Sequence, residues 1–181
     1  GKQVIFRSAV GSKGGNDLFI ASIDGDRSVK PLIATEFDEY NAEISPDGRW
    51  IAFQSNRSGH HDIYVRPFPD VDADQWPVSP SGGVKPVWSP RGHELCYLAL
   101  DGKMMSVAFS TANGFAPGTP AVLFDASHYF AQGAGRNFDI SRDGSRFIMV
   151  RNPTTHDDAD VVHVALNWAA DTVARPPGDR R

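Results

Sequence analysis

The sequence has a single cysteine, no long apolar run and no excess of basic residues. Cys96 has no second cysteine to pair with, so an intrachain disulfide is impossible and the redox compartment stays open. No apolar stretch approaches the roughly 18 residues of a membrane-spanning helix. No signal peptide is recognised at the start of the sequence, and a mature or truncated protein would lack one too. A net charge of −4 without a basic stripe argues against nucleic acid as a partner. The composition predicts a soluble protein and leaves its localisation unknown.

What the sequence does have is one kind of turn, repeated three times between short apolar runs. Serine is favoured at the first position of such a turn, proline presets φ at the second, and glycine takes the position that needs a positive φ. Each copy therefore predicts a strand, a turn and a second strand. The spacings of 44 and 52 residues, with several short strands per repeat, are typical of β-propeller blades. The copies are Ser45-Pro46-Asp47-Gly48, Ser89-Pro90-Arg91-Gly92 and Ser141-Arg142-Asp143-Gly144.

The strands of a blade run from A, the innermost, to D, the outermost. Two complete blades are expected, with strands near residues 41–45, 50–54, 62–68 and 75–78, and near 87–89, 94–98, 103–109 and 121–124. A blade before them and a blade after them are expected to be incomplete, with strands near 4–8, 17–23 and 29–33, and near 138–140, 146–150 and 161–166. In the first blade an A strand would lie before Gly1. We thus predict an all-β domain over residues 1–173, a partial propeller of three to four four-stranded antiparallel blades, and a disordered tail over 174–181.

The Ser-Pro-Asp-Gly turn followed by an aromatic-rich strand resembles the WD40-like (PD40) repeat of TolB-type propellers. Segments 62–69, 86–90 and 161–168 look like the C-terminal propeller attached to some bacterial serine/threonine protein kinases. The resemblance covers about residues 40–168 and implies the fold. It implies no kinase activity, because the chain has no glycine-rich ATP loop, catalytic-loop aspartate motif or DFG motif. The chain departs from the repeat at two positions, with Arg91 in place of aspartate and Arg142 in place of proline. It is also too short for a closed ring of that family, which needs roughly six or more blades.

A partial ring exposes the flat faces of its first and last blades. Soluble proteins rarely tolerate large apolar patches, and open sheet edges invite pairing with another chain. We therefore expect an obligate homodimer in which two copies close one propeller. The alternative is a stable monomer in which the C-terminal segment around Trp168 folds over the open face. The apolar segments expected on the open faces are Val4–Phe6, Leu18–Ile20, Phe147–Val150 and Val161–Leu166.

Four histidines fall on one face of the predicted propeller, because the B–C and D–A loops share a face. Zinc binds neutral imidazole and carboxylate groups, and a catalytic zinc site keeps one position for water. The residues lack the tight spacing of a zinc motif, so the alternative is that they are solvated loop histidines. The predicted metal ligands are His60, His61, His128 and His156. Carboxylates expected near them are Glu36, Asp38, Glu39, Asp157 and Asp158 in loops, with Glu43 and Asp139 in innermost strands.

Other chemically distinctive residues are expected to fill the core or to line the same mouth. Cys96 is expected to be buried and unreactive, and Met104 and Met105 to pack in the core. Tyr40 and Tyr129 flank the predicted mouth, where they could stack on a ligand. We further expect Trp88, Ile44 and Ile140 to pack between blades.

Three functions remain open from the sequence. The first is a binding module that holds a small-molecule ligand, a peptide or a protein partner on one face. The second is a zinc-dependent hydrolase of activated esters or phosphotriesters, which uses the histidine-bearing face. The third is a structural fragment without activity. A serine-nucleophile hydrolase is disfavoured, because no Gly-x-Ser-x-Gly motif is present.

Overall fold

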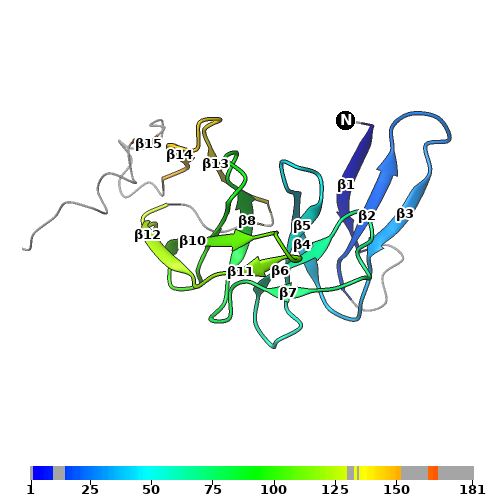
Figure 1. The fold of residues 1–181 in the computed structure, drawn as a ribbon, viewed down its shortest axis with the longest axis horizontal. Coiled ribbons are helices and arrows are strands. Elements are labelled where there is room, and N and C mark those ends of the chain that lie inside the picture. The colour runs from blue at the N-terminus through cyan, green and yellow to red at the C-terminus, as the bar shows by residue number, and fades with distance from the viewer. Residues whose placement is uncertain (1, 10–14, 130–132, 134, 152–162, 167–181) are drawn as a thin grey trace, which may run out of the picture.

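The computed structural model describes residues 2–9, 15–129, 133, 135–151 and 163–166. These residues form fifteen strands in four antiparallel sheets and contain no α-helix. Figure 1 shows the sheets side by side in chain order. This is the predicted partial β-propeller, with each sheet as one blade. Within the described residues, no helix has the length and apolar character needed to cross a membrane.

The strand bounds agree with the predicted blades. Blade 1 contains β1 (Gln3–Ser8), β2 (Asp17–Ser22) and β3 (Val29–Ile33), and blade 2 contains β4 (Glu39–Ile44), β5 (Trp50–Ser55), β6 (Asp62–Pro67) and β7 (Trp76–Pro77). Blade 3 contains β8 (Val84–Trp88), β9 (Glu94–Leu98), β10 (Lys103–Ser110), β11 (Ala116–Pro117) and β12 (Ala121–Asp125). Blade 4 contains β13 (Phe138–Ile140), β14 (Arg146–Met149) and β15 (His163–Leu166). The short β11 was not predicted, and the tail over 174–181 lies outside the described residues.

The three repeated turns adopt one geometry. Gly48, Gly92 and Gly144 have φ values of 72°, 78° and 64°, a region that favours glycine. Each glycine N–H donates to the carbonyl of the serine three residues earlier, at 2.7–2.9 Å. The hydroxyl of Ser45 also accepts a hydrogen bond from the backbone N–H of Trp50 at 3.0 Å. Each turn thereby fixes the register of the A and B strands of its blade.

The core lies between neighbouring blades, because their central strands are buried on both faces. In β5, Ile51 and Phe53 pack with blade 1, whereas the alternating Trp50 and Ala52 pack with blade 3. In β9, Leu95 and Tyr97 pack with blade 2, and Cys96 and Leu98 pack with blade 4. Because successive side chains of a strand point to opposite faces, each central strand contributes to the cores on both of its sides. Among the described residues, blades 2 and 3 are covered by other blades on both faces, and blades 1 and 4 on one face.

The residues expected to join blades do so. Trp88 of blade 3 donates its Nε1–H to the carbonyl of Glu43 in blade 2 at 2.9 Å. Ile44 packs with the cluster shared by blades 1 and 2, and Ile140 with that of blades 3 and 4. Met104 is fully buried, and Met105 packs against the cluster shared by blades 2 and 3. Cys96 is also buried, and this burial raises the pKa of its thiol to about 12, as expected for an unreactive residue.

The outward faces of blades 1 and 4 carry exposed apolar side chains. Val4 and Phe6 are 46% and 37% exposed, and Ile148 and Val150 are 47% and 55% exposed. Leu18 and Phe147, which we also expected on the open faces, are buried against the neighbouring blade, so that part of the prediction was wrong. The reason is the alternation along a strand, which sends successive side chains to opposite faces.

Candidate functional site

His60 and His61 are adjacent in the loop before β6 but have different surroundings. His60 is exposed, and its Nε2 lies 3.3 Å from the Oδ2 of Asp62. His61 contacts the Tyr40 ring edge-on at 5.8 Å. Its Nδ1 is buried and has no hydrogen-bond partner among the described residues. The two imidazoles therefore lie in different environments: His60 is beside Asp62, and His61 is beside Tyr40.

The other predicted metal ligands do not complete a site in the described part of the chain. His128 is exposed in the turn after β12, where it lowers the pKa of the nearby Asp125 as a minor contribution after hydrogen bonds from Ser127. His156, with Asp157 and Asp158, lies outside the described residues. Across the described ranges, no group of three or more His, Cys, Asp or Glu side chains could hold a metal ion. The zinc site stays a prediction.

Two of the loop carboxylates have structural partners. Asp38 accepts hydrogen bonds from the backbone and the side chain of Asn16, both at 2.8 Å, and the Asn16 side-chain bond is the main cause of its lowered pKa. Glu39 is buried at the start of β4 and bonds to Thr35 at 2.7 Å and Ser55 at 3.3 Å. Its burial raises the pKa of the carboxyl group. These residues hold the loop before β4 in place.

The innermost strands β4 and β8 share a bulge at the same end. Asn41 and Lys85 have φ values of 50° and 57°, a region that is strained for residues other than glycine. The strand register shifts at both positions. In each case the extra residue lies four positions before the serine of the repeated turn. Such outliers persist where the surroundings impose them, and they mark this end of the inner strands as a candidate site.

A chain of hydrogen bonds links these bulges from blade to blade. The Asn41 Nδ2 and the backbone N–H of Lys85 both donate to the Oε1 of Gln54, at 3.1 and 3.3 Å. The Lys85 ammonium group donates to the Oδ1 of Asn137 at 3.3 Å. Asn137 holds the same position, four residues before Ser141, in blade 4. Polar groups of three successive blades thus line one end of the inner strands.

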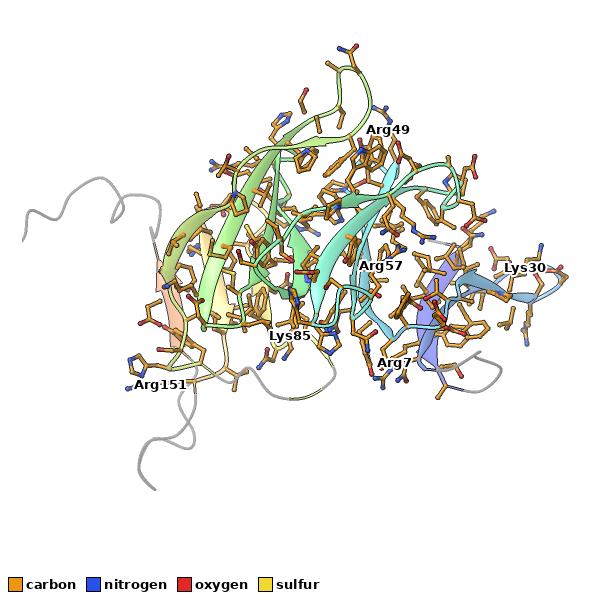
Figure 2. All side chains as sticks on the ribbon, turned by 90° about the horizontal axis from the view of Figure 1, so that it is seen from below. Arg7, Lys30, Arg49, Arg57, Lys85 and Arg151 are labelled. Atoms are coloured by element: carbon orange, nitrogen blue, oxygen red, sulfur yellow. The ribbon has the colours of Figure 1, made fainter. Side chains whose placement is uncertain are left out.

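A cavity of about 300 Å³ opens at this end. Figure 2 shows Arg7 and Lys85 at the same edge of the sheets, opposite Arg49. The Arg7 guanidinium group lies over the Tyr40 ring, 5.1 Å from its centroid. The volume is within the range of small-ligand sites. The lining residues include Arg7, Tyr40, Asn41, Gln54, His61 and Lys85.

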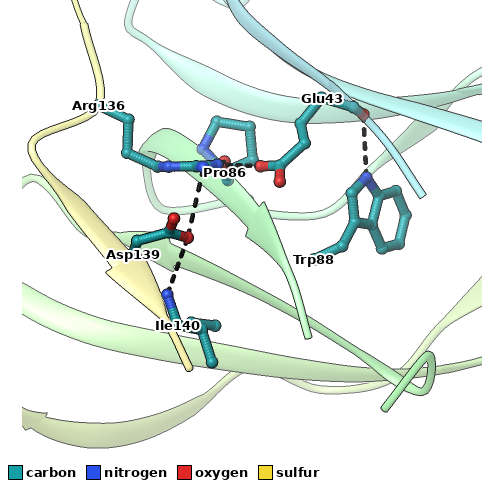
Figure 3. A network of polar contacts seen from close by, with 6 residues as sticks. All are labelled: Glu43, Pro86, Trp88, Arg136, Asp139 and Ile140. Carbon is teal, nitrogen blue, oxygen red and sulfur yellow. Dashed lines mark hydrogen bonds and ion pairs between the residues drawn. The ribbon is translucent and has the colours of Figure 1, made fainter. Parts of the chain in front are cut away.

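Further along the inner strands, Arg136 joins two carboxylates that were predicted near the mouth (Figure 3). It forms ion pairs with Glu43 of β4 and, at 3.5 Å, with Asp139 of β13. It also donates to the carbonyl of Pro86 in β8 at 3.4 Å. Burial raises the pKa of Glu43 to about 7, although Arg136 opposes this shift. One guanidinium group therefore bridges blades 2, 3 and 4.

The raised pKa of Glu43 predicts a pH dependence of stability. Folding favours the protonated form of Glu43. The contribution of this group to the free energy of unfolding is therefore largest below the unfolded pKa of 4.5 and falls as the pH rises to about 7. We expect this loss to be about 1–3 kcal/mol, and Glu43→Gln to remove it. Urea unfolding of both proteins between these pH values measures the difference. If the free energy of unfolding changes with pH in the same way for both proteins, Glu43 is not the source of the pH dependence.

The sequence reasoning missed the residues that carry this cavity. Asn41 and Lys85 line the cavity, and Asn137 bonds to Lys85. All three lie four residues before the serine of a repeated turn, a signal that was available in the sequence. Arg7 and Gln54 also share a position, because each lies one residue before the last residue of a B strand. Tyr40 was expected at the mouth and is there. Tyr129 instead forms an isolated bridge with Arg151 and packs on the cluster of blades 3 and 4.

Comparisons with solved structures identify the architecture. TolB from Acinetobacter baumannii superposes with a TM-score of 0.63 at 15% identity, over 91% of this chain and 40% of its own. The fold is a partial β-propeller. A prolyl endopeptidase superposes with a TM-score of 0.53 at 16% identity, over 83% of this chain and 25% of its own. The periplasmic gluconolactonase PpgL of Pseudomonas aeruginosa superposes with a TM-score of 0.52 at 16% identity, over 82% of this chain and 47% of its own.

At these identities the likeness shows the fold alone. The chain spans less than half the length of each of these three structures. No protein-family model matches the chain. No curated protein matches it in sequence either. The resemblance to kinase-linked propellers stays a prediction, and the activity has to be argued from the cavity itself.

Proposed function

We propose that this partial propeller is a binding module, with its ligand site in the cavity at the bulged ends of the inner strands. The observation that carries the proposal is the convergence of blades 1, 2 and 3 on one cavity, through Arg7, Tyr40 and Lys85. Propellers host unrelated activities, so the proposal rests on the cavity and not on the fold. The ligand is a small molecule, or one group of a peptide or protein partner.

A fragment screen by ligand-observed NMR tests this proposal. Val84 lines the cavity, and Val84→Trp places a large ring there. Fragments that give a binding signal with the wild type are expected to give none with Val84→Trp. The matched control is Leu100→Trp, because Leu100 is exposed and lines a different cavity. Fragments that bind the variant and the wild type equally, with the fold intact by circular dichroism, would contradict the proposed site.

A zinc-dependent hydrolase is the second candidate, and the proximity of His60 and Asp62 favours it. A histidine bonded to a carboxylate is a common arrangement around zinc, and the separation here is 3.3 Å. Elemental analysis of the purified protein separates the candidates. The binding module predicts no stoichiometric zinc. One zinc per chain, lost on His60→Ala together with ester hydrolysis, would establish the hydrolase instead.

We also propose that two copies associate through the open faces of blades 1 and 4. The exposed Val4 and Phe6 of one copy would pack on the Ile148 and Val150 of the other, which removes four apolar side chains from water. Sedimentation equilibrium is expected to give twice the chain mass of 19.7 kDa. Phe6→Glu is expected to shift the mass toward that of one chain. A wild-type mass of one chain at every concentration refutes the pairing.

A further inference from the structure

We infer that the cavity between blades 1, 2 and 3 is an oxyanion subsite that takes the carboxylate or phosphate group of a small ligand. This inference rests on the proposed function and adds the chemical class of the ligand. It comes from the balance of donors and acceptors around the cavity. Among the residues that the structure describes, the lining carries two cationic side chains, Arg7 and Lys85, and no carboxylate.

Arg7 provides a guanidinium group that is held in place yet open to a ligand. Its position over the Tyr40 ring is a cation–π contact, at 5.1 Å from the centroid. The described residues offer this guanidinium no hydrogen-bond acceptor and no carboxylate. A planar guanidinium group can donate two parallel hydrogen bonds to a carboxylate or a phosphate. Stacking on Tyr40 orients the group and reduces the entropy that binding would cost.

Lys85 provides a buried positive charge on the other side of the cavity. It is 3% exposed, and the neutral amide oxygen of Asn137 is 3.3 Å from its Nζ. Burial lowers its pKa. An anion in the cavity would recover part of the solvation that the ammonium group lost. The positive φ of 57° places this side chain at the bulge at a cost in backbone strain.

Two neutral polar residues of the lining, Gln54 and His61, can also donate to a ligand. The Oε1 of Gln54 already accepts two hydrogen bonds, so its NH₂ group is the part that can serve a ligand. The buried Nδ1 of His61 has no partner among the described residues. A buried polar atom without a partner is costly unless a ligand or water satisfies it. An oxyanion is a ligand that can accept hydrogen bonds from such donors.

The two nearest carboxylates lie beside the cavity and do not line it. Asp38 accepts hydrogen bonds from Asn16 and from the Nδ2 of Asn56, the latter at 3.2 Å. Its pKa is lowered mainly by Asn16, and its interactions with Tyr40 and His61 help to lower it. Asp62, beside His61, accepts from the hydroxyl of Ser58 at 2.6 Å and from the backbone of Gly82 at 3.0 Å. Both carboxylates are engaged by loop donors and neither lines the cavity. The cationic groups of Arg7 and Lys85 and the NH₂ group of Gln54 are therefore the donors of the lining, and the Oδ1 of Asn41 is an acceptor beside them.

The test is a titration followed by ¹H–¹⁵N NMR, with potassium acetate, acetamide and potassium phosphate at constant ionic strength. Acetate and acetamide have almost the same shape and differ in charge, so the pair isolates the anion. We expect acetate, phosphate or both to shift the amide signals of Tyr40 and Lys85 with a saturable curve. Acetamide is expected to leave them unchanged. Acetate alone identifies a carboxylate ligand, and phosphate alone a phosphorylated one.

Arg7→Gln and its control make the assignment specific. We expect Arg7→Gln to weaken anion binding about tenfold or more, because a charge-assisted pair is lost. Arg49→Gln is the matched control, since Arg49 stacks on Trp50 at 5.5 Å but lies on the opposite edge in Figure 2. It is expected to bind as the wild type does. Lys85→Met, checked for folding by its thermal midpoint, is expected to weaken binding as well.

The outcomes separate this inference from the proposed function. If acetamide binds the cavity as well as acetate does, or if neutral fragments bind while neither anion does, the oxyanion subsite is wrong and the binding module stands. Equal anion affinities of wild type and Arg7→Gln also overturn it. If neither the anions nor any fragment of the screen binds at this cavity, both proposals fail.

Discussion

Replacing Trp88 with alanine is expected to lower the free energy of unfolding by about 3–5 kcal/mol. Trp88 is 3% exposed and fills the space between blades 2 and 3, with Phe109 at 5.2 Å and Phe115 at 6.2 Å between ring centroids. The truncation leaves a cavity in this cluster. It also leaves the carbonyl of Glu43 without the indole donor. Urea-induced unfolding followed by circular dichroism measures the change.

Two further variants separate the contributions of Trp88. Trp88→Phe keeps most of the apolar volume and removes the hydrogen bond, so about 1–2 kcal/mol is expected. Val29→Ala changes an exposed side chain of β3 and is expected to stay within about 0.5 kcal/mol of the wild type. If Trp88→Ala costs no more than Val29→Ala, blades 2 and 3 do not share the core described here.

Asp62→Ala is expected to cost about 2–4 kcal/mol and to weaken ligand binding at the cavity. The carboxylate is buried at the start of β6. It accepts hydrogen bonds from the hydroxyls of Ser58 and Ser79 at 2.6 and 3.2 Å and from the backbone of Gly82 at 3.0 Å. These bonds tie together the two loops that flank His61. Their loss leaves buried donors unpaired and releases one wall of the cavity.

The matched control is Asp101→Ala. Asp101 is also bonded to its neighbours, with Lys103 at 2.6 Å, but its side chain is 56% exposed. Exposed ion pairs contribute little to stability, so Asp101→Ala is expected to cost much less than Asp62→Ala. Asp62→Asn, which keeps one acceptor oxygen, is expected to fall between the two. Equal losses for Asp62→Ala and Asp101→Ala in urea unfolding would show that the Asp62 network is not structural.

The fold could be predicted from the sequence because its signals are local and repeated. The turn at Ser45 requires a positive φ at Gly48, and the strands on either side alternate with a period of two residues. Burial of β5 and β9 on both faces follows from their continuous apolar runs. The outer faces were predicted less well, because whether Leu18 or Phe6 points outward depends on the strand register, and a shift by one residue reverses every side chain.

The site was harder to predict because its residues are far apart in the sequence and chemically ordinary. A lone arginine such as Arg7 is usually solvated, and nothing in its neighbourhood marks it as stacked on Tyr40. The bulges at Asn41 and Lys85 are tertiary features that a strand pattern does not show. The clustered histidines suggested a zinc site in the sequence. In the part of the chain that the structure describes, His61 lies beside Tyr40, in a cavity lined by cationic and amide side chains.

Ligands are expected to bind at the bulged ends of the inner strands and not at the end with the repeated turns. A map of the backbone amide shifts caused by adding a ligand from the screen to ¹⁵N-labelled protein tests this directly. We expect the shifts to gather at residues 39–41 and 83–86, with none at the turns 45–49 and 89–93. Shifts confined to those turns, or spread evenly over both ends, would contradict it.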